Sequence, residues 1–521
     1  MQKIISTIIL LLLTVTVFSQ NKYWVFFTDK QDSQFDPFTY FDTKSIERYS
    51  KMNISVYDST NFPVNEKYIS QISNIVIEVT NSTRWFNAVA VFATENQIEE
   101  VKKLSFVKKV QPIIFETYTT EFEYDSTLSI YEDELLIKQL ERMKGSEFKK
   151  NNFDGTGIRI AIFDAGFPNV DKIAVFEQIR NEKRIIATYD FAKKKEDVYA
   201  HNEHGTMVMS CIGGKIGDKQ IGLATGAEFL LARTEIESEP FSEEENWLAA
   251  AEWADKNGAD IINSSLGYTH ARYFTYQMDG ETSLVVNAAN MAAAKGMLVV
   301  NAMGNDGDND WKIVSTPADA DSILSVGGIN PDTDYHTSFS SYGPTADKRL
   351  KPNIVAYGHV IVANKEKLEE SQGTSFSSPL IAGFAACAWQ SNKELTNMQL
   401  KTQIEKSGDL YPYFDYAHGF GVPQADYFTA VELETGDDKF KFVKDGEYLN
   451  IKVNKNFIET NNAEINNYLY YHIENPEGYL DKYWLIDVYQ TDAASISLKD
   501  VKSGSTIRAF YKGFYSTFFV E

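Results

Sequence analysis

Four residues needed for nucleophilic catalysis by serine occur in this chain in the order Asp164, His204, Asn305 and Ser375. A serine hydroxyl becomes a good nucleophile when a base takes its proton and a third group orients that base. A donor must also stabilise the oxyanion that forms. The chemistry that such a set supports is acyl transfer, provided that the fold brings the four side chains together.

Ser375 lies in the stretch Gly373-Thr374-Ser375-Phe376-Ser377-Ser378-Pro379. The Gly-Thr pair permits a close approach of other groups, and Pro379 falls in what would be the first turn of a helix, where a missing N–H costs little. A serine at a helix N-terminus sits in a positive field that favours a developing oxyanion. An ordinary helix N-cap is the alternative interpretation of this stretch alone.

The other three residues also follow strand or helix boundaries. Asp164 ends the apolar run IRIAIF and precedes Ala165-Gly166, and Asn305 lies just beyond the run MLVVNA. His204 begins an apolar helical pattern and is followed by Gly-Thr, whereas His201 lacks that context and is predicted to lie in a surface loop. Taken singly, Asp164 is more typical of a turn residue or helix cap, Asn305 is part of a turn signal, and His204 has a helix-capping histidine as its alternative.

Strand-like runs alternate with amphipathic helices from about residue 125 to 433, which predicts an α/β fold with a mainly parallel sheet. Strands are expected at Ile158 to Phe163, from Ile261 and at Met297 to Ala302. In such sheets, functional residues gather beyond the carboxyl ends of the strands. The predicted fold therefore places Asp164 and Asn305 at one edge.

Across roughly residues 125 to 433 the chain resembles the subtilisin-like serine peptidases, or subtilases. The matching blocks, in the family's order, are IRIAIFDAG, HGTMVMSCIGG, ADIINSSLG, LVVNAMGNDG, FSSYGP and GTSFSSPLIAG. The resemblance implies a three-layer αβα fold with Asp164 as the orienting acid, His204 as the base and Ser375 as the nucleophile. It implies that Asn305 and the Ser375 backbone N–H form the oxyanion hole.

The resemblance also implies substrate-binding residues. Ser265, Leu266 and Gly267 match the strand that pairs with a substrate backbone, and Ala302, Met303 and Gly304 match the opposite wall of the primary specificity pocket. Ala165 stands where the family usually has Ser or Thr, and Phe376 where Met is usual. Met303 is bulkier than the family's common small residue, so the pocket size is open.

The implied function is that of a secreted serine endopeptidase of broad specificity with an apolar preference. Two alternatives remain open: a catalytically silent subtilase-fold binding protein, and a maturation protease of narrow specificity. The expected partners are a peptide or protein substrate and the chain's own propeptide as an intramolecular inhibitor. The enzyme is expected to be a monomer that needs no cofactor for catalysis.

The chain is predicted to have four parts. Residues 1–19 are typical of a secretory signal peptide, because Lys3 precedes a short apolar run, and no other segment is long and apolar enough to span a membrane. Residues 20–120 are an α+β unit whose end resembles the subtilase inhibitory propeptide, with processing expected near Tyr118 to Asp125. Residues 121–435 are the catalytic domain. Residues 436–521 change to short aromatic strands, typical of a small β-sandwich.

Composition excludes some classes of function. The chain has 521 residues, of which 43% are hydrophobic, and a net charge of −23. Nucleic-acid binding is not expected from an acidic protein. Cys211 and Cys387 are the two cysteines; two buried thiols are favoured over a disulfide.

A structural calcium ion is a weaker prediction, for which Asp306-Gly307-Asp308-Asn309-Asp310 offers oxygen ligands at alternate positions.

Overall fold

A computed structural model describes residues 21–113, 132–236, 242–269, 272–365, 367–429, 438–458 and 467–521. These residues form two compact units. One comprises the described residues within Met1–Gln34 and Phe62–Phe115, and the other those within Phe35–Asn61 and Glu116–Glu521. The predicted signal peptide and the predicted processing site lie outside the described residues. A short N-terminal segment, Phe35–Asn61, thus belongs to the larger unit.

The first unit is an antiparallel sheet with helices. Its strand order is β2-β3-β1-β4, and in the chain helix α3 precedes β2 and helix α4 lies between β3 and β4. Val25 pairs with Val89 on one side and Val110 on the other, and Val25 and Val89 are fully buried. This arrangement confirms the α+β character predicted for the region. The bounds are β1 (Asn21–Phe27), α3 (Glu66–Ser73), β2 (Glu78–Thr83), β3 (Ala88–Ala93), α4 (Glu95–Val101) and β4 (Val107–Ile113).

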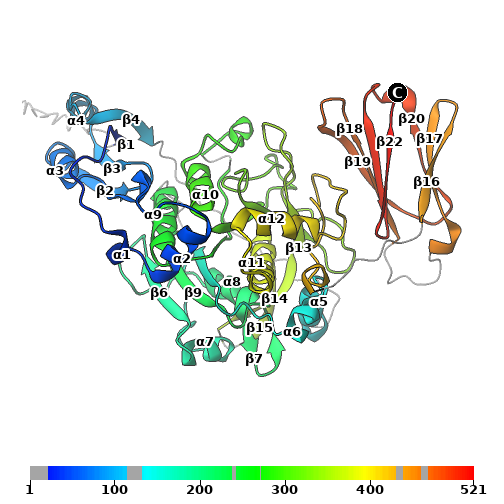
Figure 1. Ribbon diagram of the computed structural model, residues 1–521, viewed down its shortest axis with the longest axis horizontal. Coiled ribbons are helices and arrows are strands. Elements are labelled where there is room, and N and C mark those ends of the chain that lie inside the picture. The colour runs from blue at the N-terminus through cyan, green and yellow to red at the C-terminus, as the bar shows by residue number, and fades with distance from the viewer. Residues whose placement is uncertain are drawn as a thin grey trace, which may run out of the picture. The chain divides into compact units, whose positions relative to one another are not determined.

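The second unit is built on a parallel sheet of seven described strands, in the order β13-β12-β11-β10-β5-β9-β6 (Figure 1). All of its neighbouring strands run parallel. The α/β prediction is therefore confirmed. The bounds are β5 (Arg159–Asp164), β6 (Ile185–Asp190), β9 (Glu228–Arg233), β10 (Ile261–Ser264), β11 (Leu298–Ala302), β12 (Leu324–Ile329) and β13 (Ile354–Tyr357).

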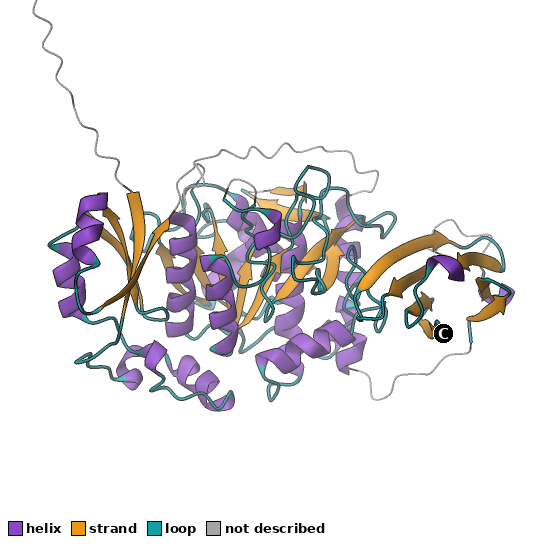
Figure 2. Ribbon diagram, turned by 90° about the horizontal axis from the view of Figure 1, so that it is seen from above, coloured by secondary structure: helices purple, strands orange, loops and turns teal. Residues whose placement is uncertain are grey.

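Helices lie on both faces of this sheet, and Figure 2 shows the helices and strands of the second unit from above. Helices α8 (His204–Gly213) and α11 (Thr374–Ser391) pack against each other, and so do α9 (Ser242–Lys256) and α10 (Leu284–Ala294). Ile160 and Ile162 of β5 belong to the core that contains α8 and α11. The next residue, Phe163, meets Trp247 of α9 edge-on at 5.4 Å between ring centroids. Because successive strand residues point to opposite faces, the two pairs lie on opposite faces.

Smaller elements surround the sheet. Helix α5 is tied to β14 by Gln139, whose Nε2 donates to Ile361 O and whose Oε1 accepts from Ile361 N. The remaining helices and strands of this part are α1 (Pro37–Tyr40), α2 (Thr43–Lys51), α5 (Glu132–Glu141), α6 (Gly145–Lys150), α7 (Glu177–Asn181), β7 (Lys215–Ile216), β8 (Lys219–Gln220), β14 (His359–Asn364), β15 (Lys367–Gln372), α12 (Asn397–Lys406) and α13 (Asp426–Thr429).

The C-terminal region contains two antiparallel sheets, ordered β16-β17-β20 and β19-β18-β21-β22. Leu449 and Ile451 of the first sheet share one core with Leu469 and Ile507 of the second. The predicted small all-β region is confirmed. The bounds are β16 (Phe440–Asp445), β17 (Tyr448–Val453), β18 (Tyr468–Glu474), β19 (Leu480–Asp487), β20 (Asp492–Ser497), β21 (Thr506–Tyr511) and β22 (Phe514–Phe519).

Candidate active site

The structure places Asp164 beside His204. Asp164 is the last residue of β5 and fully buried, and His204 is the first residue of α8. The imidazole Nδ1 lies 2.8 Å from Asp164 Oδ1, which also accepts a hydrogen bond from the backbone N–H of Ala165 at 2.8 Å. The carboxylate therefore holds Nδ1 as the protonated nitrogen and leaves Nε2 as the base.

Two opposing effects act on the pKa of His204. Burial of the ring lowers this pKa, but the negative charge of Asp164 and the hydrogen bond to it outweigh burial, and the pKa is raised above its ordinary value. The His204 side chain keeps 22% of its surface exposed. A base of this kind can both take and return a proton near neutral pH.

Gly205 is the reason why α8 can start against the end of β5. A Cβ at this position would lie 2.3 Å from Gly166 O and 2.9 Å from the Cβ of Asp164. Any side chain would push α8 away from the strand. The glycine in the His-Gly-Thr block is therefore a packing requirement of the Asp164–His204 contact.

Ser375 is the second residue of α11, and the residue after it, Phe376, contacts His204. The ring of His204 contacts Phe376, with centroids 5.5 Å apart. The Ser375 hydroxyl donates to Ser265 O at 3.2 Å, and none of the hydrogen bonds among the described residues joins it to His204. Hydrogen bonds between nucleophile and base are often long or misaligned without substrate. The missing bond therefore does not rule out His204 as the base for Ser375.

Asn305 is held against the start of α11. Its Oδ1 accepts from the backbone N–H of Thr374 at 2.9 Å and from the Thr374 hydroxyl at 2.8 Å. With its oxygen committed in this way, the amide Nδ2 is the donor that remains. The N–H of Ser375, in the first turn of α11, has no acceptor within the helix. The two groups are the donors that an oxyanion between them would need.

Comparisons with known protein families identify the family of this chain. Residues 155–421 match the subtilase family, and residues 22–125 match the peptidase S8 propeptide domain of Bacteroidota. The chain belongs to the subtilase family. The resemblance predicted from the sequence blocks is thereby confirmed, and so is the presence of an N-terminal propeptide domain.

Curated relatives of this subtilase are distant in sequence. The chain is 27% identical to serine protease AprX of Bacillus subtilis over 290 residues, 49% of this chain and 62% of that protein. It is 25% identical to the minor extracellular protease Epr of the same species, over 63% of this chain and 47% of Epr. Subtilisin E is 24% identical over 67% of this chain and 82% of its own length. The chain thus spans about half to three fifths of the first two relatives.

A buried polar network that the sequence analysis missed supports Ser375 in this subtilase. Ser378 donates to Asn263 Oδ1 at 2.8 Å, and Asn263 Nδ2 donates to the Ser265 hydroxyl at 3.2 Å. That hydroxyl donates in turn to Ser375 O at 2.8 Å. The network ties α11 to β10. Its one sequence signal is a polar residue, Asn263, inside an apolar strand.

The predicted substrate-binding stretches come together around Ser315. A Cβ on Gly267 would lie 2.2 Å from Ser315 Oγ, and one on Gly304 would lie 2.9 Å from the same atom. Asn301 adds a direct link, since its Nδ2 donates to Leu266 O at 2.9 Å. The stretches Ser265 to Gly267 and Ala302 to Gly304 are therefore neighbours beyond β10 and β11.

Met303 lies in an apolar cluster. Its side chain is fully buried and packs with other buried residues, namely Met278, Trp311, Val314 and Ala318. The bulk that set Met303 apart in the sequence is thus accommodated by these neighbours. Its effect on the specificity pocket stays a prediction.

Two further predictions concern cysteine and metal. Cys211 and Cys387 are both free and buried, which confirms the thiols favoured from sequence, and burial raises the pKa of Cys211 to about 12.

No group of three or more His, Cys, Asp or Glu residues that could hold a metal is found among the described residues. Asp306 Oδ1 accepts from Asn309 within its own turn at 2.7 Å. Calcium at this loop stays a prediction.

Proposed function

We propose that this subtilase is an exported serine endopeptidase that hydrolyses peptide bonds through an acyl-enzyme on Ser375. The observation that carries the proposal is the contact of Asp164 Oδ1 with His204 Nδ1 at 2.8 Å, supported by the hydrogen bond from Thr374, the residue before Ser375, to Asn305. Each residue type matches a separate requirement of the reaction.

The proposed reaction has two halves. Ser375 Oγ attacks the peptide carbonyl carbon while His204 Nε2 takes the hydroxyl proton, and Asp164 holds the imidazolium that results. His204 then protonates the leaving amine as the C–N bond breaks and the acyl-enzyme forms. Water then attacks the acyl carbonyl carbon while His204 Nε2 takes its proton. The bond between that carbon and Ser375 Oγ breaks, the acid leaves, and His204 Nε2 returns the proton to Ser375 Oγ.

Asn305 and the N–H of Ser375 are proposed to stabilise the oxyanion in both halves. Two features support this assignment. The Asn305 amide is fixed by Thr374, so its donor needs little reorganisation. The start of a long helix, α11 (Thr374–Ser391), also presents the positive end of its dipole to the negative charge.

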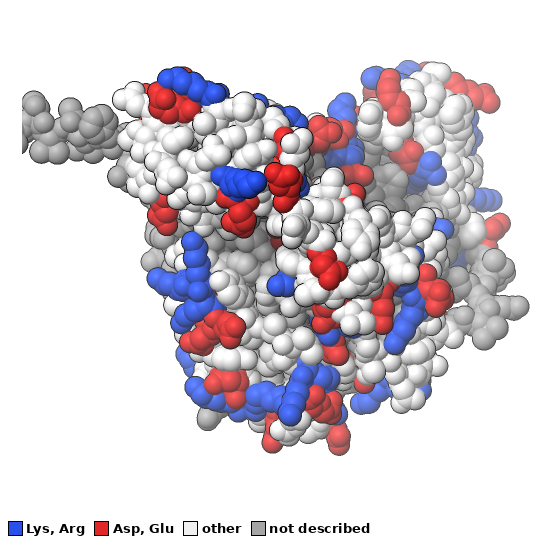
Figure 3. All heavy atoms as spheres, turned by 60° about the vertical axis from the view of Figure 1, so that its left-hand side comes forward, with Lys and Arg blue, Asp and Glu red and all other residues white. Residues whose placement is uncertain are grey.

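An extended peptide is the proposed substrate. The stretch Ser265 to Gly267 follows β10 and would pair with the substrate backbone as an added strand, with Ala302 to Gly304 opposite. Acidic and basic side chains are interspersed on the face shown in Figure 3.

We propose broad specificity with an apolar preference. The resemblance to the family and the apolar cluster that contains Met303 support this proposal.

The N-terminal region is proposed to inhibit the enzyme before processing, and the mature enzyme to act outside the cell as a monomer. Support comes from the propeptide domain match at residues 22–125 and from the extracellular relative Epr. None of the described helices is long and apolar enough to cross a membrane.

Labelling with a fluorophosphonate probe tests the proposal. The processed protein should react with the probe at one serine, and Ser375→Ala should abolish the reaction. Ser377→Ala is the matched control, because Ser377 is a buried serine of the same helix that donates to Tyr357 O, and this variant should label fully. A processed, folded protein that is not labelled would contradict the proposal and favour a binding protein without catalytic activity.

Cleavage of a peptide library tests the specificity. Broad cutting after apolar residues is the expected result. One sharply defined motif would contradict broad specificity and indicate a maturation protease instead.

A further inference from the structure

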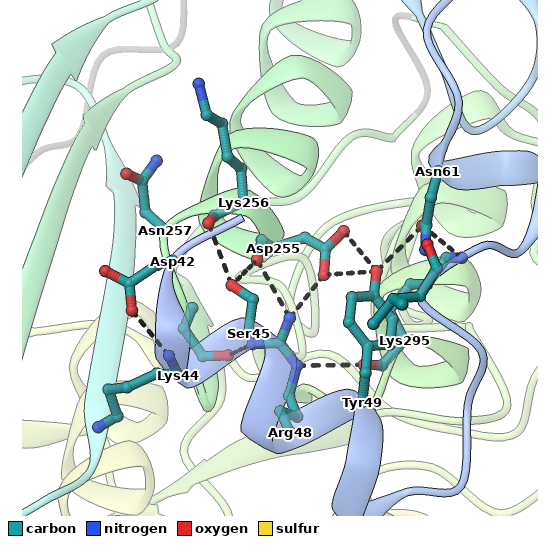
Figure 4. Close-up of polar contacts among 12 residues, drawn as sticks. Asp42, Lys44, Ser45, Arg48, Tyr49, Asn61, Asp255, Lys256, Asn257 and Lys295 are labelled. Carbon is teal, nitrogen blue, oxygen red and sulfur yellow. Dashed lines mark hydrogen bonds and ion pairs between the residues drawn. The ribbon is translucent and has the colours of Figure 1, made fainter. Parts of the chain in front are cut away.

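The segment Phe35–Asn61, which we call the clasp, binds the ends of two helices in the second unit. It lies within residues 22–125, the propeptide domain match, yet it belongs to the compact unit of the sheet. Figure 4 shows its helix α2 set against residues of α9 and α10. A cut near the predicted processing site would separate the clasp covalently from the unit that it helps to build.

Arg48 of the clasp caps the C-terminal ends of both helices. Its Nη2 donates to Asp255 Oδ1 at 2.5 Å and to Asp255 O at 3.2 Å, and its Nε donates to Lys295 O at 3.1 Å. Its Nη1 donates to Ala259 O. The Arg48 and Asp255 side chains are only 2% and 0% exposed. Arg48 thus satisfies carbonyls that a helix end leaves without intrahelical donors.

Neighbouring clasp residues extend this contact. Ser45 Oγ donates to Asp255 O at 2.6 Å, and the Tyr49 hydroxyl lies 3.0 and 2.9 Å from the two carboxylate oxygens of Asp255. Ser45 and Tyr49 are fully buried. The Asp255 carboxylate therefore lies in a buried site to which the clasp contributes a cation and hydroxyl donors.

A second buried charge depends on the clasp at the end of α10. Lys295, the C-cap residue of α10, is 4% exposed and donates to Thr60 Oγ1 at 2.5 Å and to Asn61 Oδ1 at 2.9 Å. It also pairs with Asp58 at 3.2 Å. A buried ammonium that loses such partners is strongly destabilised.

The two glycines that follow these helices are shaped to the clasp. Gly258 follows α9 and Gly296 follows α10, and both have positive φ, at 74° and 89°. A Cβ on Gly258 would lie 2.7 Å from Lys44 Cβ, and one on Gly296 would lie 2.6 Å from Met52 Cγ. The clasp therefore packs directly on both helix ends, which is the packing of a permanent interface.

This interface is remote from the candidate active site. The clasp contacts residues at the amino end of the sheet, because Lys44 pairs with Asp260, just before β10, and donates to Gly157 O, just before β5. Asp164 and Ser265 stand at the carboxyl ends of the same strands. The six residues of β5 separate these ends by roughly 20 Å.

We propose that the clasp is a second docking site of the propeptide, which keeps the severed N-terminal region bound to the catalytic unit after the chain is cut. The proposal rests on the proposed function only in taking the N-terminal region for a propeptide. Release of that region then requires extraction or proteolysis of the clasp, because Asp255 and Lys295 lose buried partners when it leaves.

The test separates binding from activity. The full chain with Ser375→Ala receives the recognition sequence of an unrelated site-specific protease between Tyr118 and Asp125, is cut there, and carries a fluorescent label on each piece. Dissociation of the two pieces is followed by dilution. The pieces should stay together, and Arg48→Ala should raise their dissociation constant at least on the order of a hundredfold, since it removes the buried cation that pairs with the Asp255 carboxylate.

A milder variant and a control complete the design. Tyr49→Phe removes one hydroxyl and should raise the dissociation constant about tenfold, even if Arg48→Ala fails to fold. Lys67→Ala is the control, because Lys67 and its partner Asp32 are 74% and 75% exposed, and the variant should bind as tightly as the parent. Pieces that separate freely in the parent, or an affinity unchanged by both clasp variants, would overturn the proposal.

The same clasp variants in the active chain distinguish the two proposals. Faster appearance of protease activity in Arg48→Ala than in Lys67→Ala is expected if both hold. If no variant shows activity but the dissociation results are as expected, the proposed function is refuted and the proposal about the clasp still holds.

Discussion

The two faces of the central sheet present opposite helix ends to their functional partners. On one face, α8 and α11 begin with His204 and Thr374-Ser375, so helix N-termini and their N–H groups form the candidate active site. On the other face, α9 and α10 end beneath Arg48, so helix C-termini and their carbonyls form the clasp site. The helix dipole explains the choice: an oxyanion suits the positive end, and a guanidinium suits the negative end.

The comparison also separates two kinds of polar burial. In the candidate active site, the carboxylate of Asp164 is bonded to His204, which must change its charge during the proposed reaction. The clasp couples the carboxylate of Asp255 to an arginine that always keeps its charge. Changes in the first region should therefore alter rate and its pH dependence, whereas changes in the second should alter stability and binding.

The largest expected effect comes from Asp164→Asn, which should lower kcat about 10⁴-fold, the size measured for the corresponding change in a chymotrypsin-like protease. Asp164 raises the pKa of His204, and the reaction needs the neutral ring, so activity rises with pH through that raised pKa. Without the carboxylate charge, the acidic limb of kcat/KM should move to lower pH. If the acidic limb of kcat/KM does not move, a group other than His204 sets the pH at which that limb lies.

The same pKa shift has a consequence for stability. Because the pKa of His204 is higher in the folded state, the stability that the Asp164–His204 pair contributes is complete below the unfolded pKa of about 6.5. It is lost as the pH rises through the folded pKa. Thermal unfolding of Ser375→Ala as a function of pH, with and without Asp164→Asn, measures this difference.

Next in size is Asp255→Ala, which tests the other region. It leaves the Arg48 charge buried without its carboxylate and should lower the free energy of unfolding by about 3–5 kcal/mol. Guanidinium unfolding of the Ser375→Ala chain, followed by tryptophan fluorescence, measures the loss. Lys150→Ala, which breaks a pair with Glu147 that is 66% and 31% exposed, should cost far less than Asp255→Ala, because water screens the exposed pair. Equal losses of unfolding free energy in Asp255→Ala and Lys150→Ala would show that burial does not make the Arg48–Asp255 pair more important than an exposed pair.

The sequence predicted one of these regions and not the other, for a physical reason. Asp164, His204 and Asn305 each adjoin a strand or a helical pattern that local periodicity reveals, and their order matches a family. Arg48 and Asp255 are 207 positions apart, and each looks like a solvated charge on an amphipathic helix. Nothing local indicates that the two helices meet, so their pairing could not be read from the chain.

The fold shows the same division. The alternating pattern predicted the parallel sheet, and the short aromatic runs predicted the C-terminal β sheets. The sequence placed residues 20–120 in a single inhibitor-like region, and that boundary stays a prediction about processing. The compact units divide those residues differently, because the contacts of Phe35–Asn61 are long-range and tertiary.

A smaller effect is expected from Asn305→Ala, which removes the proposed oxyanion donor. It should lower kcat about 10²–10³-fold with little change in KM, the range known from subtilisin itself. Thr374→Ala keeps the amide and removes one of the two groups that fix its oxygen, so its loss should be clearly smaller. If Thr374→Ala costs as much as Asn305→Ala, the amide acts on the helix start and not on the oxyanion.

The smallest predicted effect tests whether the buried network beneath Ser375 influences rate at all. Ser265→Ala removes the hydroxyl that accepts from Asn263 Nδ2 and donates to Ser375 O, while the Ser265 carbonyl that accepts from the nucleophile remains. The bond to Ser375 O is the one that bears on the rate. Loss of one such hydrogen bond, worth about 0.5–1.5 kcal/mol, should lower kcat by about threefold to tenfold with KM unchanged.

Ser377→Ala provides the matched comparison for Ser265→Ala. It also deletes one buried hydroxyl, which donates to Tyr357 O at 3.0 Å, but this hydroxyl lies outside the link between β10 and Ser375. Both variants should lose similar stability, and only Ser265→Ala should lose rate. Equal losses of kcat would mean that the rate follows general packing of α11. A loss confined to Ser265→Ala would show that the strand positions the nucleophile, as Arg48 positions the helix ends on the opposite face.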